Sequence, residues 1–594
     1  MEKRVNDFSI RVATVNGTGS QSANNILFKS LFRMGIGVCG KNLFPSNIQG
    51  LPTWFQIRVS PQGYQNLREF DDIAVLMNAD TAHDDIAAMR PNTTIFYNSN
   101  IIQLKPEEIK PGMQAYALPV EELSKQITDS KLRTLLKNLF YVGTLSVLYK
   151  IDKDTLVKVI QDTFKSKQTA IDANLQALNI GIEYAAKNFE KKDPYELKPD
   201  KKNVGKIMLE GNAAAALGSI FGGCTFLSWY PITPSSSLAE AMEGYLAKFR
   251  IDANGKAKYA IIQAEDELSS IGMVIGAAWT GARAMTTSSG PGISLMNEFI
   301  GLAYYAEVPA VIFDIQRVGP STGLPTRTQQ CDIQECALAS HGDTKHLLLF
   351  PATPKECFEL SQDAFDLADR FQTPVFVLSD LDLGMNHWLD DELVYKERKF
   401  DRGKVLTPKD LDKVSTFGRY LDVDNDGIPY RTLPGTNHAK AAFFTRGSGH
   451  DEYARYTESP AAYIRNVDRL LKKWQTARKH VPKPALLGDP KSKIGLIAYG
   501  TSHHAVIETM DRMSETPLKY LRLRAYPFGE EVEQFISSCD QVFIIEQNRD
   551  GQMRQLLEID IPGYQSKFRS IKYYGGFPLS ADIVERELKN YLGN

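Results

Sequence analysis

The sequence predicts a multidomain α/β protein built around doubly wound parallel sheets. Three observations carry this prediction. At 594 residues the chain is too long for one hydrophobic core. Between residues 205 and 384, apolar segments of strand length alternate with helical patterns, which is typical of a doubly wound parallel sheet. A shorter alternation of the same kind follows between residues 493 and 546.

Charge and composition exclude several classes of protein. The chain carries 69 basic and 71 acidic residues, so its net charge of −2 favours neither nucleic acid nor an anionic membrane as a partner. The first residues lack the apolar stretch of a signal peptide, and no run is apolar enough to span a bilayer. We therefore expect a soluble, cytoplasmic protein.

The six cysteines are scattered, and none lies in a Cys-x-x-Cys pair. Zinc and iron–sulfur sites built on four cysteines need tight local spacing. We therefore expect buried free thiols and no metal site in this chain. The cysteines are Cys39, Cys224, Cys331, Cys336, Cys357 and Cys539.

The first predicted domain covers residues 1–189. A strand at residues 11–15 leads through Gly17-Thr18-Gly19 into a helix, and glycines placed there suit either a bound anion or a plain structural turn. Because the third glycine of a dinucleotide fingerprint is missing, both alternatives stay open. A second strand is expected at residues 72–77, and residues 120–189 have the three- and four-residue spacing of helices.

A charged, proline-punctuated stretch at residues 190–206 predicts a linker. The second predicted domain follows at residues 207–390. In it we expect helices at residues 211–222, 236–249, 267–280, 292–306 and 354–371, and strands at 224–229, 259–263, 282–287, 310–315 and 375–378.

The last predicted domain covers residues 391–594. It begins with a polar segment, reaching residue 481, that is rich in turns and poor in long periodic patterns. Strands are expected after it at residues 493–498, 520–523 and 541–546, and helices at 504–513 and 532–538.

Two motifs of the last domain are set aside. Residues 422–427 copy the first half of a calcium loop, but Leu433 stands where the loop's glutamate belongs, which leaves at most a weak cation site. His503-His504 has no acidic residue at metal-binding spacing and is expected to be solvated.

The segment Tyr230-Pro231-Ile232-Thr233-Pro234 joins a predicted strand to a predicted helix. Each proline fixes its own φ and keeps the preceding residue out of the α region. The Thr233 hydroxyl is therefore held in an extended turn at the carboxyl end of a strand, where open α/β sheets bind ligands. A rigid connection without a ligand is the alternative.

Other rim segments carry charged or hydroxyl side chains. Arg317 ends a buried strand, so we expect its guanidinium to pair with a substrate carboxylate, with an internal ion pair as the alternative. Glu265, Asp266 and Glu267 open a helix after another strand, where ordinary capping would also place acids. Residues 286–292 form a third rim loop, which we expect to shape the pocket only.

Together, these motifs resemble those of the 2-oxoacid:ferredoxin oxidoreductases, thiamine-dependent enzymes that oxidatively decarboxylate 2-oxoacids to acyl-CoA. The resemblance lies in Tyr-Pro-Ile-Thr-Pro at residues 230–234 and in the segment 316–326, from Gln-Arg to Gly-Leu-Pro-Thr. It extends to residues 44–53 and 443–453, which are typical of the γ and α regions of the two-subunit 2-oxoglutarate enzymes. It implies an N-terminal γ-type domain fused to a thiamine pyrimidine-binding fold and a transketolase C-terminal-like fold.

The resemblance also implies roles for single residues. Glu267, rather than Glu265, would hold the aminopyrimidine N1′ of thiamine diphosphate and so promote the tautomer that activates the cofactor. Thr233, Arg317 and Thr326 would hold the 2-oxoacid. The cofactor-binding residues would be Glu267, Pro231 and Ile232.

Because the sequence has no Gly-Asp-Gly…Asn motif for the diphosphate, it resembles half of an active site. A beta subunit would bring the diphosphate, Mg²⁺ and a [4Fe–4S] cluster in an (αβ)₂ assembly, with CoA as co-substrate and ferredoxin as electron acceptor. The resemblance favours 2-oxoglutarate, whose distal carboxylate needs a second cation from Lys41, Arg446 or Arg455. Pyruvate or a branched-chain 2-oxoacid, a non-redox enzyme of the transketolase class, and a non-catalytic subunit are the alternatives.

Overall fold

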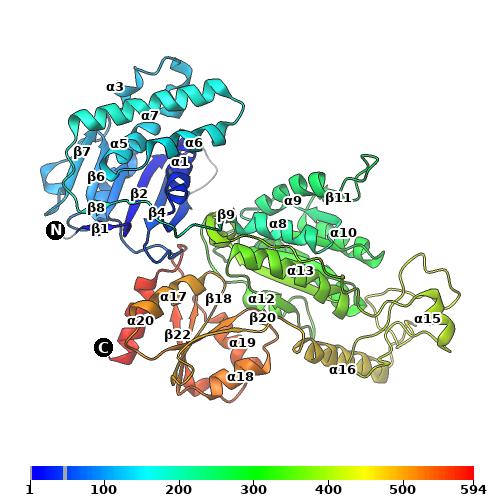
Figure 1. Cartoon of the computed structure of the whole chain (residues 1–594). Helices are drawn as coiled ribbons and strands as arrows, with labels where there is room; N and C mark the ends of the chain where they lie inside the picture. The colour runs from blue at the N-terminus through cyan, green and yellow to red at the C-terminus, as the bar shows by residue number, and fades with distance from the viewer. Residues whose placement is uncertain (1–2, 45–49, 594) are drawn as a thin grey trace. The chain divides into compact units, whose positions relative to one another are not determined.

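The computed structural model describes residues 3–44 and 50–593 (Figure 1). These residues fall into two compact units. The first comprises Met1–Met208 with Asn386–Glu392 and Ser580–Arg586; the second comprises Leu209–Met385, Leu393–Leu579 and Glu587–Asn594. The domain boundaries expected from the sequence stay a prediction. Among the described residues, no helix combines the length and apolar composition needed to cross a bilayer.

The first unit is built on a six-stranded sheet with the order β3-β4-β2-β5-β6-β7. The four strands β2, β5, β6 and β7 run parallel, while β4 pairs antiparallel with both β2 and β3. The strands are β2 (Phe8–Val15), β3 (Val38–Leu43), β4 (Pro52–Val59), β5 (Ile73–Leu76), β6 (Thr94–Asn98) and β7 (Gln114–Leu118); β1 (Arg4–Val5) pairs with β8 (Tyr195–Glu196) inside the expected linker.

Among its described residues, this unit has two clusters of buried apolar side chains. Phe8, Ile10 and Val12 of β2 belong to one, and Ala13 of the same strand belongs to the other. The helices α5 and α7 pack backbone to backbone because glycines face each other's chains. A Cβ on Gly143 would lie 2.4 Å from the Leu178 oxygen, and one on Gly181 2.3 Å from the Phe140 oxygen. The helices are α1 (Ser20–Arg33), α2 (Ala79–Ala88), α3 (Val120–Ser124), α4 (Arg133–Leu136), α5 (Leu139–Tyr149), α6 (Lys153–Phe164) and α7 (Gln168–Asn188).

The second unit contains a seven-stranded sheet with the order β11-β10-β12-β13-β15-β14-β20. All neighbours are parallel except the β14–β20 pair. The chain leaves β10 toward β11 on one side and returns to β12 on the other, which makes a topological switch point between β10 and β12. The strands are β10 (Phe226–Trp229), β11 (Ala260–Gln263), β12 (Ala284–Ser288), β13 (Ala310–Gln316), β14 (Leu347–Leu349), β15 (Pro374–Asp380) and β20 (Ala525–Tyr526).

The helices of this sheet confirm the expected alternation. They are α8 (Gly211–Phe221), α9 (Ser236–Phe249), α10 (Glu267–Trp279), α11 (Gly290–Ala306), α12 (Ile333–Ala337), α13 (Pro354–Phe371) and α14 (Leu381–Met385). The short elements α12, β14 and α14 were not expected. They are only three to five residues long, too short to establish a periodic pattern.

Residues 391–481, expected to be poor in long periodic segments, contain one long helix. The 18-residue helix α16 (Pro460–Ala477) follows the short helix α15 (Pro408–Lys413). Apolar residues at helical spacing were overlooked there: Ile464, Val467, Leu470, Leu471 and Trp474. The buried side of the helix also includes Asn466, Arg469 and Lys473. Two short strands, β9 (Lys206–Glu210) and β16 (His387–Asp391), also pair with each other.

The C-terminal part of the second unit contains a five-stranded sheet with the order β17-β19-β18-β21-β22. Its expected strands and helices are present, β21 at the expected bounds and the others shifted by one or two residues, and β17, α19 and β22 are additional. The elements are β17 (Ala485–Gly488), β18 (Ile494–Tyr499), α17 (Ser502–Arg512), β19 (Lys519–Leu523), α18 (Glu530–Ser537), β21 (Gln541–Glu546), α19 (Gln552–Asp560) and β22 (Phe568–Lys572). The last helix, α20 (Ala581–Leu592), is divided between the two units after Arg586.

Candidate active site

The predicted site residues of the second unit follow the carboxyl ends of neighbouring parallel strands. The loop at residues 230–235 follows β10, Glu267 comes shortly after β11, Ser289 follows β12 and Arg317 follows β13. Because β10, β11, β12 and β13 are parallel neighbours, these ends lie on one edge of the sheet. The switch point between β10 and β12 lies on the same edge, which is where such sheets bind ligands.

The loop after β10 is fixed by its own hydrogen bonds. The Ile232 amide donates to the Ser236 hydroxyl at 3.0 Å, and the Ser235 amide donates to the Ile232 carbonyl at 2.9 Å. Thr233 and Ile232 are half-buried, while Pro231 is exposed. The loop therefore holds its peptides in one conformation at the edge of the sheet.

Glu267 and Glu265 differ sharply in their surroundings. Glu265 is exposed, whereas Glu267, the first residue of α10, is only 6% exposed. Asp266 caps this helix by accepting a 2.6 Å hydrogen bond from the Ser269 amide, so capping does not need Glu267. A Cβ on Gly292 would lie 2.8 Å from the Glu267 Cγ, and hence only glycine leaves room for the carboxylate beside α11.

Arg317 connects two of the rim loops. Its Nη1 donates to the Thr233 carbonyl at 2.7 Å, and its Nε is buried without a hydrogen-bond partner among the described residues. Burial lowers the pKa of Arg317, and the nearby carboxylates of Asp332 and Glu267 partly offset that effect. The guanidinium is therefore oriented by the protein and keeps donor capacity for an anionic ligand.

The loop between Arg317 and Thr326 folds back on itself. The Leu324 amide donates to the Val318 carbonyl, and the Val318 amide donates to the Arg327 carbonyl, both at 3.1 Å. Thr326 is buried and its carbonyl accepts a 2.9 Å hydrogen bond from Arg327. Thr326 does not line the cavity that contains Arg317.

A cavity of about 750 Å³ lies beside Arg317. Its wall combines the start of α11, the segments 317–322 and 329–335, and a loop at residues 548–552 from the C-terminal sheet. The Gln552 side chain donates to the Cys331 carbonyl at 2.6 Å, and Asn548 donates to the Gln330 carbonyl at 2.9 Å. This contribution of the C-terminal part was not predicted.

Two buried acids near Arg317 were also missed. Asp314 lies inside β13 and Asp332 precedes α12, and both are buried. The Asp314 carboxylate is contacted by the Cys336 thiol at 3.6 Å, and burial together with the charge of Asp332 raises the pKa of Asp314. A carboxylate in the middle of the apolar run Ala-Val-Ile-Phe-Asp-Ile was a signal for Asp314, because isolated charges are costly inside a sheet.

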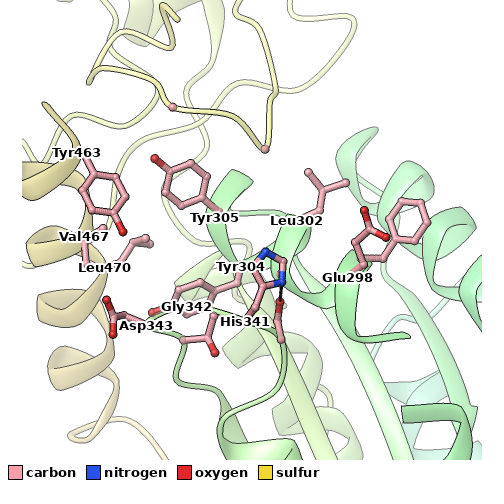
Figure 2. Close-up of a pocket in the computed structure, with 16 residues that line it drawn as sticks. Glu298, Leu302, Tyr304, Tyr305, His341, Gly342, Asp343, Tyr463, Val467 and Leu470 are labelled. Carbon is pink, nitrogen blue, oxygen red and sulfur yellow. Dashed lines mark hydrogen bonds between the residues drawn. The ribbon is translucent and has the colours of Figure 1, made fainter. Parts of the chain in front are cut away.

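A second cavity of about 740 Å³ contains none of the predicted site residues (Figure 2). It is lined by Leu302, Tyr304 and Tyr305 from α11, by the loop with His341 and Asp343, and by Tyr463 from α16. We do not place the candidate site there.

The motifs set aside in the sequence have structural partners. In the loop 422–427, Lys404 pairs with Asp424 at 2.6 Å and with Asp426 at 2.9 Å, so a lysine ammonium already occupies the carboxylates that a cation would need. The expectation that His503-His504 is solvated is wrong. Both are half-buried; His504 Nε2 lies 2.8 Å from the Ala352 carbonyl oxygen, and burial lowers the pKa of His503 to about 2.

The glycine loop of the first unit packs as a structural turn. Gly17 and Gly19 have positive φ, and a Cβ on Gly19 would lie 2.2 Å from the Leu135 oxygen. The Asn138 side chain donates to the Thr18 carbonyl at 2.7 Å. Residues 45–49 of the γ-type motif lie outside the described residues. All six cysteines are free as predicted, and all but the half-buried Cys331 are buried.

Comparisons with known proteins agree with this geometry. Residues 9–184 match the family described as pyruvate ferredoxin/flavodoxin oxidoreductase, and residues 217–398 match the pyruvate flavodoxin/ferredoxin oxidoreductase thiamine diphosphate-binding domain. The alpha subunit of 2-oxoacid:ferredoxin oxidoreductase 2 from Aeropyrum pernix is 30% identical, over 93% of this chain and 92% of that protein. The chain belongs to the 2-oxoacid:ferredoxin oxidoreductases.

Two further relatives of this family refine the comparison. The KorA subunit of 2-oxoglutarate synthase from Methanocaldococcus jannaschii is 35% identical over 54% of this chain and 84% of KorA. A 2-oxoglutarate:ferredoxin oxidoreductase structure from Magnetococcus marinus, with 2-oxoglutarate, coenzyme A and succinyl-CoA bound, matches with a TM-score of 0.87 and 28% identity, covering 99% of this chain and all of that one. The predicted family, α/β fold class and enzyme class are confirmed, and the chain is an alpha subunit.

The edge of the sheet fits the pyrimidine side of thiamine diphosphate. Glu267 offers a buried carboxylate at this edge, Gly292 leaves room beside it, and the half-buried Ile232 lies in the loop after β10. The hydroxyls of Ser288 and Ser289, buried without partners among the described residues, line the same edge. When bound, the cofactor supplies the nucleophilic carbon for reactions of 2-oxoacids.

Proposed function

We propose that this alpha subunit binds the 2-oxoacid and the aminopyrimidine of thiamine diphosphate, and that its physiological substrate is 2-oxoglutarate. The reaction would be oxidative decarboxylation to succinyl-CoA with electrons passing to ferredoxin, reversible in principle. The observation that carries the proposal is Arg317, a buried guanidinium held at the sheet edge by Thr233, with donor capacity left for a carboxylate.

Each residue of the site has a proposed task. Glu267 holds the aminopyrimidine N1′. Protonation of N1′ by Glu267 would promote the reactive tautomer of the cofactor. Pro231 and Ile232 contact the cofactor from the β10 loop. Arg317 binds the carboxylate next to the ketone, and Thr233 and Thr326 hold the 2-oxoacid beside it.

A beta subunit is the proposed partner. It would supply the diphosphate and Mg²⁺ site and a [4Fe–4S] cluster, in an (αβ)₂ assembly that uses CoA and ferredoxin. Large apolar side chains exposed around the sheet edge support a partner surface there. They are Ile262 of β11, Met273 of α10 and Leu295 of α11.

The substrate proposal requires a second cation for the distal carboxylate. Lys41 is buried in the first unit with its Nζ 3.0 Å from the centre of the Trp388 ring, and Arg446 packs on Phe444. Arg455 packs on Tyr453. Arg549 joins these candidates, because it is the other basic residue among the described residues that line the cavity of Arg317.

Steady-state kinetics of the purified complex test the substrate. We expect kcat/KM for 2-oxoglutarate to exceed that for pyruvate and for a branched-chain 2-oxoacid, with a viologen dye as electron acceptor. Pyruvate matching 2-oxoglutarate would overturn the substrate and leave the reaction class standing.

Four variants identify the second cation: Lys41→Ala, Arg446→Ala, Arg455→Ala and Arg549→Ala. Replacing the residue that binds the distal carboxylate should lower kcat/KM for 2-oxoglutarate but not for pyruvate, because pyruvate has no distal carboxylate. A variant that lowers both values equally would have a structural role. If none of the four substitutions changes the ratio of kcat/KM for 2-oxoglutarate to kcat/KM for pyruvate, the distal carboxylate is not bound by any of these cations.

A further inference from the structure

Behind Arg317 lies a pair of carboxyl groups that the proposed reaction does not use. Asp314 projects from β13 and Asp332 from the segment before α12, and both side chains are buried. One oxygen of each, Asp314 Oδ1 and Asp332 Oδ2, has no hydrogen-bond donor among the described residues. Burial raises the pKa of both carboxyl groups, and the neighbouring Asp332 raises that of Asp314 further, because two buried carboxylates disfavour each other's ionisation.

The pair is packed against the substrate edge. A Cβ on Gly290, the first residue of α11, would lie 2.9 Å from an oxygen of Asp332, so only glycine admits this carboxyl group. The Cys331 thiol donates to the Arg317 carbonyl at 3.2 Å and approaches the Asp332 carboxylate at 3.5 Å. Asp332 and Arg317 line the same cavity.

The charges facing Asp332 are mostly negative. Asp314 faces it from β13, and Arg317 from the loop that follows β13. Glu335 and the Cys336 thiol face it from α12, and Cys331 from its own segment. Burial raises the pKa of Asp332 to about 7, Glu335 adds to the shift, and Arg317 partly offsets it. Arg549 and Asp550 lie farther along the cavity wall and pair with each other at 2.7 Å.

We propose that Asp332 is a positioning residue that balances the charge of Arg317, and that the Asp314–Asp332 pair takes up a proton when the 2-oxoacid carboxylate binds. In the free enzyme the anionic form of Asp332 keeps the guanidinium compensated. An incoming carboxylate replaces that charge, and the added negative charge stabilises the protonated form of the pair. The proton comes from solvent, and no bond to carbon is made or broken. This inference rests on the proposed role of Arg317 and not on which 2-oxoacid is preferred.

The test is the pH dependence of KM for the 2-oxoacid in the intact complex between pH 6 and 8.5. Carboxyl groups of 2-oxoacids stay ionised throughout this range. In the unmodified enzyme, KM should rise with pH by up to about tenfold per unit above pH 7, because binding is linked to uptake of one proton. Asp332→Asn should flatten this profile to within about twofold, since linkage to a single proton is lost, and leave kcat less affected than KM.

Asp343→Asn, an acidic residue of the other cavity, is the matched control and should keep the profile of the unmodified enzyme. If Asp332→Asn fails to fold, Asp314→Asn serves instead and should move the rise in KM to lower pH. A flat profile in the unmodified enzyme, or an unchanged slope in Asp332→Asn, would overturn the proposal. The measurement uses whichever 2-oxoacid the complex oxidises best. Its result therefore does not depend on whether 2-oxoglutarate is the preferred substrate.

Discussion

The second unit buries acidic groups in two places, and it treats them in opposite ways. Glu307, at the end of α11, is fully enclosed by cations: Arg469 and Lys473 of α16 each contact its carboxylate at 2.6 Å, and Arg419 donates to its carbonyl at 2.8 Å. Burial alone would raise its pKa, but these cations outweigh burial and lower the pKa of Glu307 to about 2. At the sheet edge, burial instead raises the pKa of Asp314 and Asp332.

The difference separates a structural cluster from a reactive one. Both oxygens of the Glu307 carboxylate are paired with Arg469 and Lys473, so this carboxylate joins α11 to α16 and has no free acceptor for a ligand, although Arg469 Nε and Arg419 Nη1 have no hydrogen-bond partner among the described residues. The edge cluster has carboxyl oxygens and an Arg317 nitrogen without partners among the described residues. Unsatisfied buried polar groups are costly, and their concentration at a ligand-binding edge favours a functional role.

The largest effect on stability is expected from Glu307→Gln. Removing this carboxylate leaves Arg469 and Lys473 buried without their counter-charge, which costs on the order of 3–5 kcal/mol of unfolding free energy. Denaturant unfolding measures it, with the exposed Glu298→Gln of the same helix as control. If the unfolding free energy falls by less than about 1 kcal/mol, the range of exposed ion pairs, the cluster contributes little to stability.

The largest effect on activity is expected from Glu267→Gln. This substitution keeps the shape and removes the carboxylate, so kcat should fall by more than about a hundredfold while the unfolding midpoint stays close to that of the unmodified chain. The matched control is Glu265→Gln, two residues away and exposed, which should stay active. The reverse pattern in the two variants would move the catalytic role to Glu265.

Gly292→Ala tests the close approach of α11 to Glu267. The new Cβ would lie 1.9 Å from the Ser288 hydroxyl and 2.8 Å from the Glu267 Cγ, so the carboxylate must shift. We expect kcat to fall about tenfold, the equivalent of 1–2 kcal/mol of overpacking. Gly276→Ala on α10, where a Cβ meets nothing within 4 Å, is the control and should keep kcat. Equal activity of both variants would mean that Glu267 needs no fixed position.

The unfolding free energy should depend on pH in opposite directions for the two clusters. The lowered pKa of Glu307 means that its contribution to stability is present above pH 4.5 and is lost as the pH falls toward 2. The raised pKa of Asp332 acts oppositely, because the folded state binds the proton more tightly, so this contribution grows as the pH falls from 7 to 4. Unfolding curves of Glu307→Gln and Asp332→Asn across this range should lose the respective slopes; unchanged slopes would contradict the assignments.

How far the sequence predicts this site depends on how local each signal is. The two prolines around Ile232-Thr233 and the arginine at the end of a strand can be recognised from a few neighbouring residues, and both features were predicted. Asp332 follows Gln-Gln-Cys outside any periodic pattern, and Asn548 comes from a loop more than 200 residues later along the chain. Only the tertiary fold brings these residues to the cavity.

The helix α16 shows a different limit in the structural cluster. Its apolar residues have helical spacing, but no periodic pattern indicates that Arg469 and Lys473 are buried beside them. Their burial is possible because Glu307, 162 and 166 residues earlier, neutralises them. The fold class was predictable because the main helices of the seven-stranded sheet, α8, α9, α10, α11 and α13, are 11 to 18 residues long and alternate with apolar strands.

The central claim is that Arg317 is held for a ligand whereas Arg469 is held for the fold. Parallel measurement of Arg317→Ala and Arg469→Ala in the intact complex tests it most directly. For Arg317→Ala we predict an unfolding midpoint near that of the unmodified chain and a rise in KM for the 2-oxoacid, but not for CoA, equivalent to about 2–5 kcal/mol. For Arg469→Ala we predict a lower midpoint and an unchanged KM. An unchanged KM in Arg317→Ala, with a midpoint as low as that of Arg469→Ala, would make Arg317 a structural residue and contradict the account.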